Sequence, residues 1–245
     1  MPESTFHELL EACGQSGCPV CRLESRTLER YVGNLFYESV NDVKTREHLR
    51  GSLGLCREHA QLTVDKKLGN ALGFAIIYQD VIKNILRGME KDATPPTSTR
   101  RLASFLKQMP EQVSAAVQRV IYALTPHKHC LVCQQQEKAV QIFISALVSS
   151  LSDPETAKAF QASDGLCIPH LKKALELVRD SSTYDLLLSV NREKLESLNA
   201  ELAEYIRKSD YRFQHEGFGT EGDSWRRAVN KLTGDRIYKN KTSEE

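Results

Sequence analysis

The sequence predicts an all-α fold, built from a duplicated helical unit with two metal-clipped Cys3His knuckle pairs. Three observations predict it. A metal-ligand pattern occurs twice, apolar residues follow each copy's first cysteine pair at helical spacing, and no segment shows the apolar–polar alternation typical of strands. With 245 residues, 40% of them hydrophobic and 27% charged, the chain has the composition of a globular protein with a substantial core.

The metal-ligand pattern consists of a C-x-x-C knuckle followed by a C-x-x-H knuckle. The interval between them is 35 positions in the first copy and 34 in the second, and six of the seven cysteines belong to the pattern. Three thiols and one imidazole are the ligand set of a closed tetrahedral zinc site. The predicted ligands are Cys18, Cys21, Cys56 and His59 in the first copy and Cys130, Cys133, Cys167 and His170 in the second.

The two knuckles of one copy are expected to bind the same ion. The alternative is crossed pairing, in which each ion joins a knuckle of one copy to a knuckle of the other. Crossed pairing would interlock the two copies in a two-fold-like manner, and the spacing of the ligands is compatible with both arrangements.

An amphipathic helix is predicted after each C-x-x-C knuckle. In both copies apolar residues begin seven positions after the second cysteine and follow the spacing i, i+3, i+4, i+7, i+8. The stripes are Leu28, Tyr31, Val32, Leu35 and Phe36 in the first copy and Val140, Phe143, Ile144, Leu147 and Val148 in the second.

A second, shorter helix is predicted to start at Asp42 in the first copy and at Asp153 in the second, because aspartate is a favoured N-cap residue. Fourteen residues separate each aspartate from the next ligand cysteine. Gly54 and Gly165 lie two positions before that cysteine, where a glycine suits a helix end with positive φ. The repeat therefore extends beyond the ligands.

The predicted position of the ligands at helix N-termini explains how a metal would be useful. Helix dipoles favour thiolates at those ends. A metal held by two knuckles would pin two helix ends that are distant in sequence, and its binding energy would offset the entropy of closing the loop.

The other helices follow from the same spacing rules. A short helix is predicted at 6–13, a long one from His59 to about Lys91, and further ones at 100–107, 110–124, 171–179, 184–207 and 225–233. Consecutive prolines and small polar residues make 93–99 the clearest linker. The predicted domains are a first metal-binding repeat at 1–92, connecting helices at 93–126, a second repeat at 127–208 and an aromatic, basic C-terminal segment at 209–245.

The C-terminal segment carries a local net charge of +4 between Tyr205 and Lys241. Basic residues interleaved with aromatic ones can bind single-stranded nucleic acid, which makes Trp225, Arg226 and Arg227 candidate contacts for nucleic acid or another partner. The favoured interpretation is that the aromatic side chains pack the segment against the helical body while the charges remain solvated.

The cysteines also allow other chemistry. An iron–sulfur cluster could use the same ligand set, and Cys18–Cys21 could be a redox pair, although the strand that normally precedes such a pair is absent. Cys13 lies outside the repeats and is interpreted as a partly buried helix residue rather than as a fifth ligand.

The two knuckle pairs, the G-L-C-x-x-H segments and the ending D-Y-R…W-R-R-A…K-L-T-G together resemble a bacterial family known only as a domain of unknown function. Its members repeat C-P-x-C and G-[FL]-C-x-x-H. The resemblance covers nearly the whole chain; the second copy departs from it because Cys130-Leu-Val-Cys133 lacks the proline, which leaves the ligands unaffected. The resemblance implies a cytoplasmic, cysteine-rich bacterial protein and implies no activity.

The functional prediction is a non-catalytic protein with two structural zinc ions that acts as an interaction or regulatory module with an unidentified protein partner. The alternative is a redox or iron–sulfur protein that uses the same cysteines as a thiol switch or for electron transfer. No catalytic motif was identified. The N-terminus lacks a secretory signal and no apolar run reaches bilayer length, so a cytoplasmic location without membrane contact is expected. The oligomeric state is left open.

Overall fold

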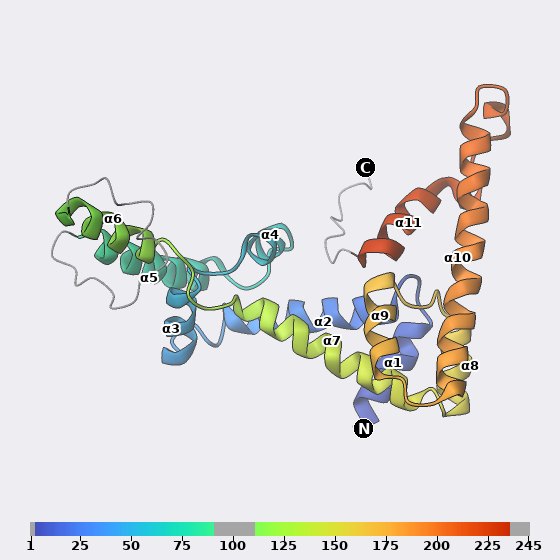
Figure 1. Ribbon diagram of the computed structural model, residues 1–245, viewed down its shortest axis with the longest axis horizontal. Helices are drawn as coiled ribbons and strands as arrows, with labels where there is room; N and C mark the ends of the chain where they lie inside the picture. The colour runs from blue at the N-terminus through green and yellow to red at the C-terminus, as the bar shows by residue number, and fades with distance from the viewer. Residues whose placement is uncertain (1–2, 91–110, 236–245) are drawn as a thin grey trace. The chain divides into compact units, whose positions relative to one another are not determined.

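The computed structural model describes residues 3–90 and 111–235 (Figure 1). These residues form eleven α-helices and two short 3-10 helices, and the described part of the chain contains no strand. The all-α prediction is therefore confirmed. The predicted linker at 93–99 and helix at 100–107 lie outside the described residues. None of the described helices combines the length and the apolar character that crossing a membrane requires.

The chain divides into two compact units that do not correspond to a simple cut in the sequence. Unit 1 comprises residues 1–28 and 136–245, and unit 2 comprises residues 29–135. The boundary falls within two long helices, α2 (Pro19–Leu35) and α7 (Leu131–Ser150). Each unit thus combines parts of both predicted copies, whereas the assignment of 1–92 and 127–208 as repeats stays a prediction.

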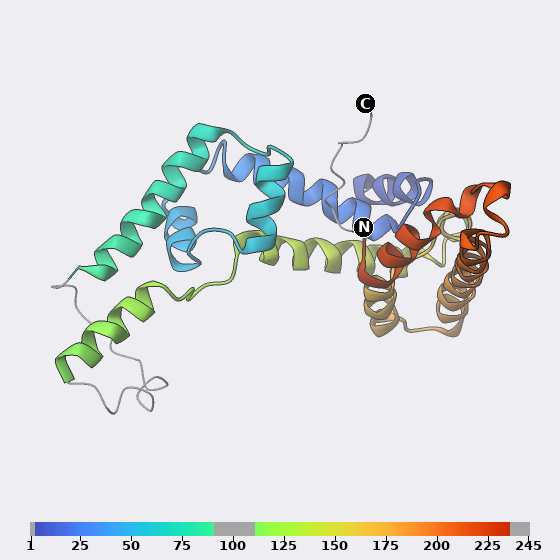
Figure 2. The ribbon, with the colours of Figure 1, turned by 90° about the horizontal axis from the view of Figure 1, so that it is seen from above.

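Unit 1 contains the start of α2, most of α7, and α1 (Glu3–Cys13), α8 (Pro154–Ala162), α9 (Ile168–Leu177), α10 (Ser181–Ser209) and α11 (Ser224–Thr233). Two 3-10 turns, η1 (Gln214–Glu216) and η2 (Thr220–Asp223), join α10 to α11. Helix α10 contacts α8, α9 and α11 (Figure 2). Fully buried side chains form the core of this unit, among them Leu9, Leu23, Leu147, Phe160, Leu166 and Leu187.

Unit 2 contains α3 (Val43–Gly51), α4 (Arg57–Asp65), α5 (Ala71–Met89) and α6 (Glu111–Ala123), together with the end of α2 and the start of α7. Helix α5 packs against α3 and α6. The buried carboxylate of Asp80 on α5 accepts hydrogen bonds from Arg46 (3.2 Å) and Arg50 (2.8 Å) on α3. Burial opposes ionisation of Asp80, but the two arginines outweigh it and lower its pKa.

The long helix predicted from His59 to Lys91 is wrong, because α4 and α5 are separate helices. Gly69 between them has φ +72°, and a Cβ there would lie 2.6 Å from Cβ of Phe36. Asn70 then caps α5 by accepting a hydrogen bond from the Gly73 amide at 2.6 Å. The Gly–Asn sequence is a recognisable stop and start signal that outweighs the continuous apolar spacing around it.

The predicted caps of the short helices are confirmed. Asp42 caps α3 and Asp153 caps α8, each by accepting a hydrogen bond from the amide three residues later, at 2.7 and 2.9 Å. The glycines at 54 and 165 have positive φ, of 89° and 66°. The short helices end at Gly51 and Ala162, and the two glycines follow them, two residues before the ligand cysteines at which the next helices begin.

Candidate metal centres

The structure brings the eight predicted ligands together into two groups of four. Site 1 consists of Cys18, Cys21, Cys167 and His170, all in unit 1. Site 2 consists of Cys56, His59, Cys130 and Cys133, all in unit 2. Within each group the ligand atoms all lie within 4.8 Å of one another. The expected pairing within each copy is therefore wrong, and the crossed arrangement is the one observed.

A long helix separates the two knuckles of each copy, and the first of these helices is α2. Its 17 residues make a rod of about 26 Å, with the C-x-x-C knuckle at its first turn. The next knuckle in the sequence, Cys56 and His59, follows this helix after α3 and belongs to unit 2, whereas the first turn of α2 belongs to unit 1. Helix α7 has 20 residues and likewise lies between the two knuckles of the second copy.

All eight ligands occupy equivalent positions at helix starts. Cys56 and Cys167 are the N-cap residues of α4 and α9, and neither side chain makes a capping hydrogen bond. Cys18 and Cys130 directly precede α2 and α7 in the same way. The remaining four ligands are the third residues of these helices. Two ligands three positions apart thus face the same side of each helix start, where the helix dipole favours thiolates.

The distances at site 1 are uniform. Nδ1 of His170 lies 3.5, 3.4 and 3.3 Å from the sulfur atoms of Cys18, Cys21 and Cys167. The sulfur atoms of Cys21 and Cys167 are 3.6 Å apart. All four residues are buried, with exposed fractions between 1% and 7%.

Site 2 has the same arrangement of ligands, but its nitrogen–sulfur distances vary more than those of site 1. Nδ1 of His59 lies 3.2 Å from the sulfur of Cys56, 3.3 Å from that of Cys133 and 3.9 Å from that of Cys130. The sulfur atoms of Cys56 and Cys133 are 3.7 Å apart. In contrast to site 1, Cys56 and Cys133 are partly exposed.

These spacings fit a single tetrahedral ion. Zinc bonds of about 2.3 Å to sulfur and about 2.0 Å to nitrogen place sulfur atoms about 3.8 Å apart and sulfur about 3.5 Å from nitrogen. The observed distances lie within a few tenths of an ångström of these values. The cysteines are free thiols, so the short sulfur–sulfur distances are not disulfide bonds.

A buried carboxylate supports the histidine of site 1. Oε2 of Glu24 lies 3.5 Å from Nε2 of His170, and Oε1 of Glu24 accepts a hydrogen bond from the Gln136 amide. Burial raises the pKa of Glu24. Carboxylates in this position fix the tautomer and orientation of a metal-bound imidazole. Sequence reasoning missed Glu24, although its position three residues after Cys21 on the same helix is a usable signal.

The ionisation of the thiols is shifted by their neighbours. Burial opposes ionisation of Cys18, but hydrogen bonds with Cys167, Cys21 and His170 outweigh it and lower its pKa well below the usual value. Burial likewise opposes ionisation of Cys130, whereas hydrogen bonds from His59 and from backbone amides lower its pKa to about 6. Both sites thus favour at least one thiolate, which is the form that binds metal.

Cys13 is not part of either group. It lies in α1 with an exposed fraction of 3%, in the core of unit 1. Burial raises its pKa to about 11. Cys13 is thus a helix residue outside the ligand groups, as predicted, but it is fully buried rather than partly buried.

Gly234 and Asp235 of the C-terminal segment lie against site 1. The backbone amide of Asp235, just after α11, donates a hydrogen bond to the sulfur of Cys21 at 3.3 Å. Gly234 has φ +89°, and a Cβ there would lie 3.9 Å from the sulfur atoms of both Cys21 and Cys167. Sequence reasoning did not connect this segment with the site, because a backbone contact over more than 200 residues leaves no pattern beyond the glycine itself.

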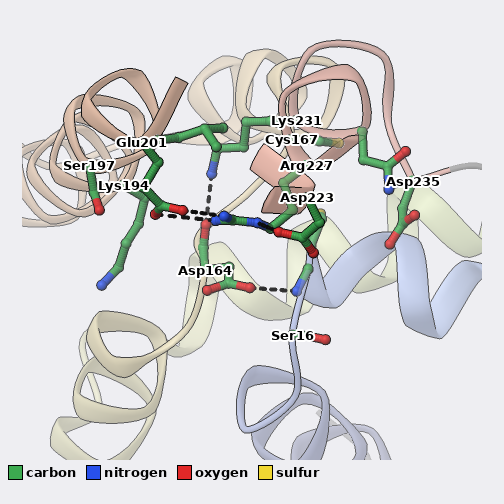
Figure 3. A pocket seen from close by; sticks show the side chains of 14 residues that line it. Ser16, Asp164, Cys167, Lys194, Ser197, Glu201, Asp223, Arg227, Lys231 and Asp235 are labelled. Carbon is green, nitrogen blue, oxygen red and sulfur yellow. Dashed lines mark hydrogen bonds and ion pairs between the residues drawn. The ribbon is translucent and has the colours of Figure 1, made fainter. Parts of the chain in front are cut away.

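A cavity of about 250 Å³ lies beside site 1, between α10 and α11 (Figure 3). Cys18 and Cys167 contribute to its wall. Arg227 points between Glu201 and Asp223 and forms ion pairs with both, the second at 2.7 Å. Nζ of Lys231 donates to the carbonyl oxygen of Asp164 at 2.7 Å. Charged side chains of α11 therefore attach this helix to the rest of unit 1, through Glu201 on α10 and the backbone of Asp164.

The three residues predicted as nucleic-acid or partner contacts have different surroundings. Arg227 is used in the ion pairs just described, whereas Arg226 stacks over the ring of Trp225 at 5.0 Å and Trp225 is 45% exposed. The aromatic side chains of the segment pack only in part: Phe218 stacks on Tyr205 at 4.7 Å, while other rings remain solvated. Contact with nucleic acid stays a prediction.

The comparisons with known proteins agree with the unknown-function resemblance. Residues 8–239 match the model of a family described as a family of unknown function (DUF6062). An uncharacterized 23.9 kDa protein encoded in the xynA 3′ region of Caldicellulosiruptor sp. (strain Rt8B.4) is 25% identical over 228 residues, which cover 92% of this chain and 99% of that protein. No solved structure matches the chain. Because the matched region spans nearly all of its residues, this chain belongs to that family of unknown function.

Proposed function

We propose that this protein is a non-catalytic zinc protein, in which each of the two Cys3His groups binds one structural zinc ion. The observation that carries the proposal is the closed grouping of all eight ligands at the starts of four helices. Each ion would tie together two helix starts that are distant in sequence. Structural zinc contributes directly to folding free energy, so the two ions would stabilise the two units.

The spacing of the sulfur atoms supports zinc over an iron–sulfur cluster. A cluster of several iron and sulfide ions occupies the space between its ligands and needs widely separated thiolates. The sulfur atoms here are 3.6 Å apart in site 1 and 3.7 Å apart in site 2, which leaves room for one ion. Four protein ligands also leave no open position for a substrate, which favours a structural role over metal catalysis.

The experiment is metal analysis of protein purified without oxygen, together with a visible spectrum. We expect two zinc ions per chain and no absorption in the visible range. Iron with inorganic sulfide in a coloured protein would overturn the proposal in favour of the redox alternative. A colourless protein without bound metal would overturn it in favour of free thiols.

We further propose that α11 presents the contact surface for a protein partner. Trp225, Val229 and Leu232 follow the spacing i, i+4, i+7 and are 45%, 54% and 61% exposed. The apolar stripe thus faces solvent, while Arg227 and Lys231 anchor the opposite face. Exposed apolar stripes of this kind are typical of interaction sites. Arg226 beside the stripe favours a partner whose apolar patch adjoins an acidic side chain.

A photo-reactive amino acid in place of Val229 tests this surface in cells. We expect a cross-linked product of defined mass from this position. The matched control is the same replacement at Glu193 on α10, whose polar side chain is 72% exposed. Equal cross-linking from both positions, or none from position 229, would contradict a partner site on α11.

A further inference from the structure

The two metal sites have the same ligands but differ in access to the thiolates. In site 1, Cys21 and Cys167 are 3% and 1% exposed. In site 2, the corresponding residues Cys133 and Cys56 are partly exposed. The sulfur–sulfur distances are nearly equal, 3.6 Å for the first pair and 3.7 Å for the second. Access, and not spacing, therefore distinguishes the two pairs.

The protection of site 1 comes from a segment outside the repeated pattern. The amide of Asp235 donates to the sulfur of Cys21, and Gly234 lies against the sulfur atoms on that side. A hydrogen bond to a thiolate withdraws electron density that an electrophile would otherwise attack. The ion pair of Arg227 with Glu201 on α10 and the hydrogen bond from Lys231 to the carbonyl oxygen of Asp164 hold this segment in place.

We propose that Cys56 and Cys133 form an oxidation site for peroxides, at which a disulfide replaces zinc in site 2 while site 1 keeps its ion. This inference rests on the proposed binding of two zinc ions. The susceptibility of a cysteine to oxidation follows its thiolate character and its exposure. Both residues are zinc-bound thiolates in the proposed state, and both reach the surface.

The reaction balances with a peroxide ROOH as the oxidant. One thiolate attacks the peroxide oxygen, which breaks the O–O bond and yields a sulfenic acid and the alkoxide RO⁻. The second thiolate attacks the sulfenic sulfur, forms the S–S bond and expels hydroxide. Two protons from solvent convert the leaving groups to ROH and water. The two thiolates have then supplied the two electrons that reduce the peroxide.

The consequence for the metal follows from the ligand count. Zinc in site 2 loses two of its four ligands, and Cys130 and His59 alone do not form a closed site. The new disulfide joins the N-cap of α4 to the third residue of α7, the same two helix starts that the ion held. Unit 2 thus exchanges a metal link for a covalent one, which thiol reductants reverse.

The test uses the full chain loaded with zinc and treated with hydrogen peroxide. A chromogenic chelator reports zinc release, and alkylation followed by peptide mass spectrometry identifies the oxidised residues. We expect one of the two ions to leave about tenfold faster than the other, in step with a Cys56–Cys133 disulfide. Release of both ions at equal rates, earlier oxidation of Cys21 or Cys167, or a disulfide that contains Cys130 would overturn the inference.

Two variants serve as matched controls. In Cys21→Ser, site 1 is lost and the remaining ion should stay sensitive to peroxide; in Cys56→Ser, site 2 is lost and the remaining ion should resist it. A resistant ion in Cys21→Ser together with a sensitive ion in Cys56→Ser would refute the assignment of the oxidation site to site 2. If either variant fails to fold, the peroxide experiment on the unmodified chain still tests the inference. Metal analysis before peroxide is added separates the two proposals. Absence of zinc at that stage refutes the proposed function, whereas two ions lost together refute only the selective oxidation.

Discussion

Replacement of Glu24 tests how much the buried carboxylate contributes to metal binding at site 1. Its Oε2 atom lies 3.5 Å from Nε2 of His170, and both side chains are 8% exposed. The contact is long but shielded from water, so solvent screens it little. Glutamine at this position keeps an oxygen acceptor and removes the charge, whereas alanine removes both.

The expected magnitude follows from these differences. Loss of a group that supports a metal-bound histidine costs about 10- to 100-fold in affinity, or about 1.4–2.7 kcal/mol. Because glutamine retains the acceptor, Glu24→Gln should fall at the lower end of this range. Glu24→Ala should reach the upper end, since it also leaves the Gln136 amide without its acceptor.

Titration with a competing chelator measures this effect, with site 2 as an internal reference in the same molecule. Only one of the two zinc affinities should change. Glu11→Gln provides a control of the same chemistry in unit 1, because the exposed ion pair of Glu11 with Arg26 involves none of the ligands and should leave both affinities unchanged. A folded Glu24→Ala protein with two unchanged zinc affinities would refute the supporting role of the carboxylate.

The other predictions concern stability and metal content. Asp80→Asn should destabilise unit 2 by about 1–2 kcal/mol in denaturant unfolding. Since the fold lowers the pKa of Asp80, the ionised carboxylate stabilises the folded state above the ordinary carboxyl pKa, and this stabilisation is lost as the pH falls through the lowered pKa. The free energy of unfolding of the variant should lack this part of the pH dependence. Gly69→Ala should cost at least about 1 kcal/mol because φ is positive there, whereas Gly33→Ala, which meets open space in α2, should be neutral or stabilising. Metal analysis should find one zinc ion per chain in Cys167→Ser and two in Cys13→Ser; two ions in the first variant would contradict the ligand assignment.

Local signals made much of the fold predictable. The helices, the aspartate caps at 42 and 153 and the glycines with positive φ follow from short-range rules that neighbouring residues satisfy by themselves. The break between α4 and α5 was missed because apolar spacing continues across it, although Gly69 and Asn70 mark it. Local reasoning thus failed where two local signals conflicted.

The ligands were predictable, but their partners were not. Spacing within each knuckle is a local property, so all eight residues stand out in the sequence. Their grouping depends on how segments that are distant in the sequence pack together. The roles of Glu24 and of the Asp235 amide depend in the same way on contacts between distant segments.

Loop entropy does not decide the pairing of the knuckles. Crossed pairing closes loops of 146 residues at site 1 and 77 at site 2, in place of loops of 35 and 34. The extra cost is about 1 kcal/mol per site, because it grows only with the logarithm of loop length. Zinc binding of about 10–16 kcal/mol exceeds it many times over. The difference in loop entropy therefore does not prevent the crossed arrangement, in which each site takes its ligands from both halves of the sequence.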